Sequence, residues 1–237
     1  MITIKIADIP IGIDNKYLHI KNLARDYLTD LAPLFTVSAT EGELDKEASL
    51  SSVEFTRGYL EAVVVYRKIA EQLPRYDAFV FHGAVMSLEG EAYAITARSG
   101  VGKTTHTRLW LEAFGDRAHY LNGDKPIIRF IDGVPYACGT PWQGKEDYGR
   151  CEMRPLRSIA FLERGKENHA YEIPLRDATI RMASQIYLPK ENPTNTLLAM
   201  SLLDKILRSV TLVRLECNMD ISAAHVAIQA MTKGEFK

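Results

Sequence analysis

Residues 92–110, AYAITARSGVGKTTHTRLW, decide the fold of this chain. The first five residues form a mostly apolar run that predicts a short buried strand. Residues 104–114 follow a helical pattern, and Gly115 is placed to end that helix. A strand, a loop with two glycines and a helix follow one another directly, and this order predicts a phosphate-binding loop.

The residue types in that loop suit a nucleoside triphosphate. Gly100 and Gly102 let the backbone come close to phosphate oxygens, and the first turn of the helix offers free N–H groups. Lys103 supplies a positive charge for the β- and γ-phosphates, and the Thr104 hydroxyl is placed to bind Mg²⁺. The strict loop pattern has glycine where this chain has Ala97, and we expect a methyl group to be tolerated there. We therefore expect ATP and Mg²⁺ to bind through Ser99, Gly100, Val101, Gly102, Lys103, Thr104 and Thr105.

Asp124 follows the strand that we predict at residues 118–121. This order would place its carboxylate at the carboxyl edge of the sheet, beside the phosphates. There it could bind Mg²⁺, directly or through water, or accept a proton from an attacking hydroxyl group. The alternative is a turn-forming aspartate in Asn122-Gly123-Asp124.

His82 lies in a β-rich segment, residues 79–85, for which we predict a strand. A histidine close to the loop could orient the γ-phosphate or share a proton with Asp124. The alternative is a hydrogen-bonded histidine of the core.

The rest of the chain alternates between predicted strands and helices, which indicates an α/β class with a mixed sheet. Residues 1–75 are predicted to form a small N-terminal α+β module, with strands at residues 2–6 and 35–39. In this module Thr40 and Glu43 predict a capping box, and a longer helix follows at residues 53–73. Residues 76–237 are predicted to form the nucleotide-binding domain, with hairpins at Glu89-Gly90 and Asp132-Gly133, strands at 158–162 and 212–215, and helices at 177–187, 194–208 and 222–232.

The composition is that of an ordinary folded domain with a near-neutral charge. The chain has 237 residues, a formal net charge of -1 and three widely spaced cysteines. We therefore expect no nucleic acid and no membrane as partners, and the cysteines fit neither a disulfide framework nor a zinc site. The sequence has no transmembrane-length apolar run, and its first residues alternate like a strand rather than like a signal peptide. A cytoplasmic protein with reduced thiols is expected.

These motifs resemble the C-terminal domain of HPr kinase/phosphorylase, a P-loop fold that is related to phosphoenolpyruvate carboxykinase. Phe81-His82-Gly83-Ala84-Val85 is similar to the His-Gly strand of that family, residues 97–104 to its phosphate loop, and Asn122-Gly123-Asp124 to its acidic motif. The run from Ser99 to Trp110 resembles a branch of small HPr-kinase-like proteins. In the family a histidine, a lysine and an aspartate form the catalytic set, and the aspartate acts as base toward a serine hydroxyl. The resemblance assigns these roles to His82, Lys103 and Asp124.

The resemblance implies an ATP-dependent kinase that transfers the γ-phosphoryl group to a hydroxyl group of a peptide, a protein or a small molecule. It also implies that the chain can form homo-oligomers. Lys125 stands where the family has a second acid, and Glu146 is the candidate for the metal-binding role of the family's glutamate signature. Glu146 belongs to a turn-rich segment, residues 139–147, which is either a mobile substrate or metal loop or an ordinary surface connection. The competing functions are a non-catalytic ATP sensor and an ATPase that needs no acceptor.

Overall fold

The fold was obtained as a computed structural model, which describes residues 1–144 and 149–236. Strands and helices alternate along much of the described chain, so the expected mixed α/β class is confirmed. The elements are β1 (Ile2–Ile6), β2 (Ile9–Asp14), α1 (Leu18–Leu23), β3 (Phe35–Ser38), α2 (Glu41–Ser49), α3 (Arg57–Gln72), β4 (Ala78–Val80), β5 (Ala84–Leu88), β6 (Glu91–Thr96), α4 (Lys103–Phe114), β7 (Ala118–Asn122), β8 (Ile127–Ile131), β9 (Val134–Cys138), β10 (Met153–Arg164), β11 (His169–Glu172), α5 (Leu175–Ala183), α6 (Pro193–Ser209), β12 (Thr211–Cys217) and α7 (Ser222–Met231).

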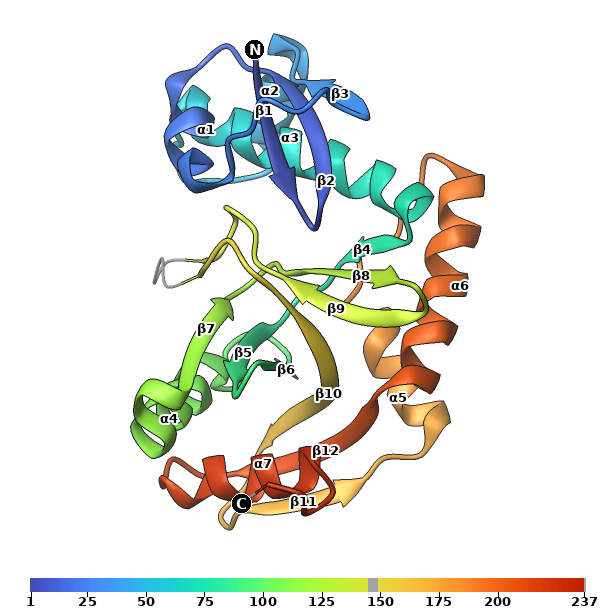
Figure 1. The fold of residues 1–237 in the computed structure, drawn as a ribbon. Helices are drawn as coiled ribbons and strands as arrows, with labels where there is room; N and C mark the ends of the chain where they lie inside the picture. Colours follow the sequence, from blue (N-terminus) through green and yellow to red (C-terminus); the bar gives the residue numbers. More distant parts are fainter. Residues whose placement is uncertain (145–148, 237) are drawn as a thin grey trace.

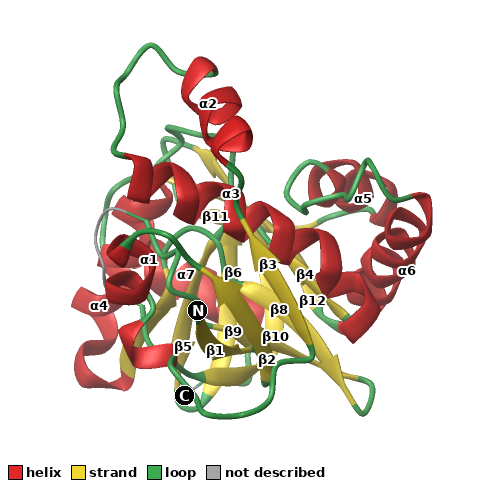
Figure 2. Ribbon diagram, turned by 90° about the horizontal axis from the view of Figure 1, so that it is seen from above, coloured by secondary structure: helices red, strands yellow, loops and turns green. Residues whose placement is uncertain are grey.

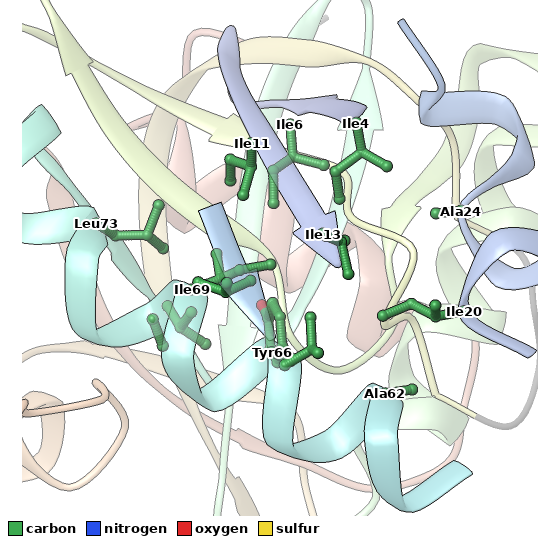
Figure 3. Close-up of a cluster of buried hydrophobic side chains, with 14 of the residues drawn as sticks. Ile4, Ile6, Ile11, Ile13, Ile20, Ala24, Ala62, Tyr66, Ile69 and Leu73 are labelled. Carbon is green, nitrogen blue, oxygen red and sulfur yellow. The ribbon is translucent and has the colours of Figure 1, made fainter. Parts of the chain in front are cut away.

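The N-terminal elements build a separate three-stranded sheet, which is drawn in blue in Figure 1. β1 and β2 form an antiparallel hairpin, and β2 pairs in parallel with β3. The alternate isoleucines of the hairpin are buried, and Figure 3 shows several of them facing Tyr66 and Ile69 of α3. The period-2 pattern of β1 and the apolar stripe of α3 therefore meet in one core, which is what stabilises this module.

Side-chain caps fix the ends of two helices in this module. Thr40 and Glu43 form the predicted capping box in front of α2. α3 begins at Arg57, later than predicted, because the side chain of Thr56 accepts a hydrogen bond from the N–H group of Tyr59.

The larger sheet is held together by the long strand β10. Its strand order is β4-β8-β9-β10-β6-β5-β7, and β12 pairs with both β10 and β11. Residues 153–155 of β10 pair antiparallel with β9, whereas the later residues of β10 pair in parallel with β6 and β12. The sequence predicted only the second part of this strand. The hairpins β5–β6 and β8–β9 turn at the predicted Glu89-Gly90 and Asp132-Gly133, where all four φ angles are positive.

The directions of the strands bring the ends of several strands to one edge of this sheet. β6, β10 and β12 run in parallel, and β5 runs antiparallel to both β6 and β7. The carboxyl ends of β6, β7, β10 and β12 therefore lie at the same edge as the amino end of β5. Ligands of α/β sheets bind at such an edge, where the loops leave the strands.

Helices cover both faces of the sheet. α4 and α7 pack on one face, where Trp110, Phe114 and Ile228 belong to one core cluster. α5 and α6 pack on the other face, against residues such as Phe81 and Phe161. Figures 1 and 2 show α4 and the α5–α6 pair on opposite sides of the strands.

His106 is buried within the α4 layer and is 3% exposed. Burial lowers the pKa of His106 to about 4, because an imidazolium ion is costly away from water. The unfolded chain therefore takes up this proton first as the pH falls, and the stability that the neutral imidazole contributes is present above about pH 6.5 and is lost toward pH 4.

We expect this titration to lower the free energy of unfolding by about 3 kcal/mol between those two pH values. His106→Gln should lack this part of the pH dependence, because glutamine does not titrate. Urea unfolding of both proteins across this pH range measures the free energy of unfolding. The same pH dependence of that free energy in both proteins would contradict the assignment to His106.

His82 lies between β4 and β5, so the predicted strand over residues 79–85 is wrong at this point. The link is held by a different part of the chain: the N–H group of His82 donates to the carbonyl of Gln185 at 2.7 Å, and Phe81 forms a bridge with Ile186. α5 correspondingly ends at Ala183 rather than near Tyr187, because Ser184 and Gln185 form a turn and Ile186 then pairs with Phe81.

The expected domain boundary near residue 75 stays a prediction. The core of the N-terminal module continues into Val80, Ile127 and Cys138, which follow that boundary in the sequence. Among the described residues, no helix is both long enough and apolar enough to cross a membrane.

Candidate functional site

The glycine loop, residues 97–102, connects β6 to α4 at the shared edge of the sheet. Gly100 and Gly102 have φ angles of 78° and 123°, which L-residues rarely adopt. Apart from their neighbours in the chain, no atom of the described residues lies within 4 Å of where a Cβ would stand. Ala97 is not among the residues with positive φ. The alanine at this position is therefore compatible with the backbone of the loop.

The start of α4 fits an anion. Its N-cap residue is Gly102, which has no side chain to cap the first turn, and that turn contains no acidic residue. Backbone N–H groups and the positive end of the helix dipole are therefore available at the loop. This arrangement suits the phosphate groups that the loop sequence predicts.

Lys103 folds back over the loop. Its Nζ donates to the carbonyl of Ala97 at 3.3 Å. Burial lowers the pKa of Lys103, and the nearby charge of Asp124 opposes that shift. The ammonium group thus interacts electrostatically with Asp124 from within the loop.

Asp124 sits on a rigid turn that a neighbouring side chain makes. Asn122 is fully buried, and its Oδ1 accepts from the N–H groups of Asp124 and Lys125 at 2.9 Å and 2.8 Å. Its Nδ2 donates to Oγ1 of Thr140 at 3.0 Å. Because Asn122 supplies the hydrogen bonds of the turn, the Asp124 carboxylate is left for other contacts.

His82 faces that carboxylate. The distance from His82 Nε2 to Asp124 Oδ1 is 3.5 Å, and the two side chains are 42% and 36% exposed. A histidine of the core, which the sequence left open as the alternative for His82, would be less exposed than this. Burial and the charge of Lys103 lower the pKa of His82, while Asp124 acts in the opposite direction. The imidazole is therefore uncharged at neutral pH.

Two residues that the sequence did not single out hold His82 in place. The hydroxyl of Thr96, at the end of β6, lies 2.9 Å from the carbonyl of His82 and 3.0 Å from Oε1 of Gln185. Gln185 also accepts from the backbone N–H group of His82. Thr96 could have been suspected from its place before the loop, whereas Gln185 is too distant in the sequence to give any signal.

Two cavities open on either side of the glycine loop. The cavity on the α5 side measures about 880 Å³ and is lined by His82, the loop residues and the inner face of α5. The cavity on the α4 side measures about 430 Å³ and is lined by Val101, His106, the last residues of β10 and β12 and the residues directly after them. Neither lining includes Lys103 or Asp124. Val101, Leu162 and Glu163 form the wall between the two cavities.

Charged residues at the end of β10 brace this wall. Burial by itself raises the pKa of Glu163, but its hydrogen bonds to Arg214 and Arg181 outweigh that effect, so the pKa is lowered. Arg181 belongs to α5 and Arg214 to β12, so Glu163 ties both elements to the edge. Arg164 binds the loop directly, with Nε and Nη2 donating to the carbonyls of Val101 and Gly100 at 3.0 Å and 2.5 Å. The available sequence signal was its position shortly after the strand that we predicted at residues 158–162.

Arg164→Ala should weaken MgATP binding about tenfold, because the loop loses two hydrogen bonds from a cation that fix its peptide planes. The exposed Arg208, paired with Asp204 on α6, provides a matched control, and Arg208→Ala should bind normally. Calorimetry measures both affinities, and added guanidinium should partly restore binding to the Arg164 variant. Unchanged affinity would show that the loop keeps its shape without this contact.

The metal-binding residues expected from the sequence are only partly placed. Thr104 lies in the first turn of α4 and Asp124 at the same edge, whereas Glu146 lies outside the described residues. Within residues 1–144 and 149–236, no group of three or more His, Cys, Asp or Glu side chains is arranged to hold a metal ion.

Comparison with known proteins adds little information about the function of the chain. No protein-family model and no curated protein matches the chain. Among solved structures, the Hpr(Ser) kinase/phosphatase from Coxiella burnetii resembles it at a TM-score of 0.29 and 10% sequence identity. That match covers 54% of this chain and 95% of the other. The likeness is distant and carries no weight for the function, which depends on the site itself.

Proposed function

We propose that the chain is an ATP-dependent kinase that transfers the γ-phosphoryl group of ATP to a hydroxyl group of a peptide, protein or small-molecule acceptor. The observation that carries this proposal is the meeting of His82, Lys103 and Asp124 at the glycine loop. These residues come from three different segments: His82 Nε2 lies 3.5 Å from Asp124 Oδ1, and the charge of Lys103 acts on both of these side chains.

The loop and Lys103 would bind and orient the triphosphate. The uncapped first turn of α4 presents N–H groups, and the half-buried ammonium group supplies a positive charge in a partly desolvated place. Thr104 and Asp124 are the residues of this chain that would hold Mg²⁺. The ion would neutralise charge on the phosphate oxygens.

Asp124 would accept the proton of the attacking hydroxyl group. Its carboxylate is not used by the turn, and it lies beside an uncharged imidazole. His82 would fix the orientation of this carboxylate through Nε2, while its backbone is held by Gln185. A base with a fixed orientation within reach of the phosphates is what a kinase requires and a nucleotide sensor does not.

The test combines nucleotide binding with a search for the phosphorylated product. Calorimetry should show MgATP binding, and incubation with labelled ATP and a host-cell extract should give a product that carries one additional phosphoryl group by mass spectrometry. Lys103→Ala serves as the control for contaminating kinases. Rapid ATP hydrolysis without an acceptor would favour the ATPase instead. Binding without turnover, even in extract, would favour the sensor.

A further inference from the structure

We propose that Tyr66 of the N-terminal module is a positioning residue for Asp124, so that this module takes part in phosphoryl transfer. The inference rests on the proposed function, in which Asp124 is the base. It adds a contact from outside the larger sheet. Tyr66 belongs to α3 (Figure 3), whereas Asp124 follows β7 at the edge of that sheet.

The hydroxyl group of Tyr66 reaches the residue next to the base. It donates to the backbone carbonyl of Lys125 at 2.8 Å. Oγ1 of Thr140 donates to the same carbonyl at 3.0 Å. A carbonyl oxygen has two lone pairs, so both bonds can form together. The main chain directly after Asp124 is therefore held from two sides, by α3 and by the segment that follows β9.

The same polar network continues into the turn that carries Asp124. Oγ1 of Thr140 accepts from Nδ2 of Asn122 at 3.0 Å, and both of these side chains are fully buried. Oδ1 of Asn122 in turn accepts from the N–H groups of Asp124 and Lys125. Each group in a buried network fixes the position of the next one. A displacement of the Lys125 carbonyl would therefore be passed on to the carboxylate of Asp124.

Tyr66 is itself firmly held. Its side chain is 6% exposed, and its ring stacks on that of Trp142 with the ring centroids 4.2 Å apart. The indole N–H group of Trp142 donates at 3.1 Å to the carbonyl of Ala62, which lies four residues before Tyr66 in α3. Because α3 holds both aromatic rings, the Tyr66 hydroxyl is a fixed support for the main chain beyond Asp124.

The turn that carries Asp124 lies between Tyr66 and the segment of His82. On the His82 side, the N–H group of Gly83 donates to the carbonyl of Asp124 at 3.0 Å. On the other side, burial raises the pKa of Tyr66, and the nearby charge of Asp124 acts in the same direction. The hydroxyl group thus keeps its proton, as a donor must, and lies close enough to interact with the carboxylate.

Tyr66→Phe should lower the rate of phosphoryl transfer about tenfold and leave the affinity for MgATP unchanged, because a small displacement of a catalytic group is costly for the reaction. Phenylalanine keeps the ring on Trp142 and removes only the hydroxyl group. The Lys125 carbonyl keeps its bond from Thr140, so the fold should survive. Labelled ATP with host-cell extract measures the transfer, and calorimetry measures the affinity. Transfer at the wild-type rate would overturn the proposal.

Tyr93→Phe is the matched control. Tyr93 is 3% exposed, and its hydroxyl group donates to the Glu91 carboxylate at the start of β6, away from the glycine loop. This variant also loses one tyrosine hydroxyl group from a buried ring, but it should transfer phosphoryl groups at the wild-type rate. An equal fall in both variants would show that the loss is a general effect of destabilisation and would overturn the proposal.

A double-mutant cycle separates positioning from a purely structural role. In the Asp124→Asn background, Tyr66→Phe should change the transfer rate by less than about twofold, because the base that it positions is gone. A purely structural role predicts the same fall in both backgrounds, and that result would overturn the proposal.

A last measurement needs neither an acceptor nor a nucleotide. Amide hydrogen exchange, followed by NMR, should be about tenfold faster at Asp124 and Lys125 in Tyr66→Phe, because the turn loses one hydrogen bond of its support. Exchange in the β8–β9 hairpin should not change. Unchanged exchange at Asp124 and Lys125 would overturn the role of Tyr66. Absence of transfer by the wild-type protein would instead contradict the proposed function, and the exchange rates would still decide whether Tyr66 fixes the turn.

Discussion

Asp124→Asn should lower phosphoryl transfer by about 10²–10⁴-fold and leave the affinity for MgATP close to that of the wild-type protein. The substitution keeps the size of the side chain but removes its charge and its ability to accept a proton, and general-base assistance is worth about that factor. The turn should survive, because its hydrogen bonds come from the side chain of Asn122. The measurement is ATP affinity and transfer rate across a Mg²⁺ series.

Two other outcomes of this experiment have distinct meanings. If Asp124 is mainly a metal ligand, the dependence on Mg²⁺ should shift to higher concentrations, with partial recovery when the ion is abundant. If it serves only the turn, the variant should retain its activity, and the role as base is wrong. Asp132→Asn is the matched control, because Asp132 lies in the β8–β9 hairpin with a positive φ that asparagine also tolerates.

Lys103→Ala should abolish productive nucleotide binding, with a loss of affinity of roughly 100-fold or more. The ammonium group is partly desolvated beside the loop, and within residues 1–144 and 149–236 its hydrogen bond is to the carbonyl of Ala97. Its loss should therefore matter for the ligand far more than for the fold, so thermal unfolding should change little. Calorimetry with MgATP and a melting curve measure the two effects separately.

Lys125→Ala is the control for this second prediction. Lys125 brings a positive charge to the same edge, with Nζ 4.0 Å from the Asp124 carboxylate, but it lies outside the glycine loop. A specific role for Lys103 requires a much smaller loss of affinity in the Lys125 variant. Similar losses in both would show that the edge attracts phosphate only through its overall charge, and normal binding by the Lys103 variant would exclude the phosphate-loop interpretation.

The features that the sequence predicted correctly depend on a few neighbouring residues. The glycines of the loop and of the two hairpins are required by their own φ angles, and the capping box of α2 closes within three residues. The helix after the loop is amphipathic over its own length, so α4 could be located to within one residue. Such features are fixed by local backbone sterics and hydrogen bonds, which a sequence displays directly.

The prediction of a continuous strand through His82 failed for the opposite reason. Its segment has strand-forming residues, but the backbone of His82 is held by Gln185, and Thr96 reaches Gln185 across 89 positions of sequence. Arg164 likewise reaches the loop across 63 positions. No local pattern encodes such contacts, because they exist only when the packed sheet brings the segments together.

The sequence by itself thus determined a glycine loop followed by a helix, an acidic turn after the next strand, and a mixed α/β class. The tertiary structure decided that His82 meets Asp124, that β10 braces the loop through Arg164, and that a cavity lies on each face of the loop. The physical reason is the register and direction of β5, β6, β10 and β12: their pairing places residues from four separate segments at one edge, and side-chain packing against α4 and α5 shapes the space between them.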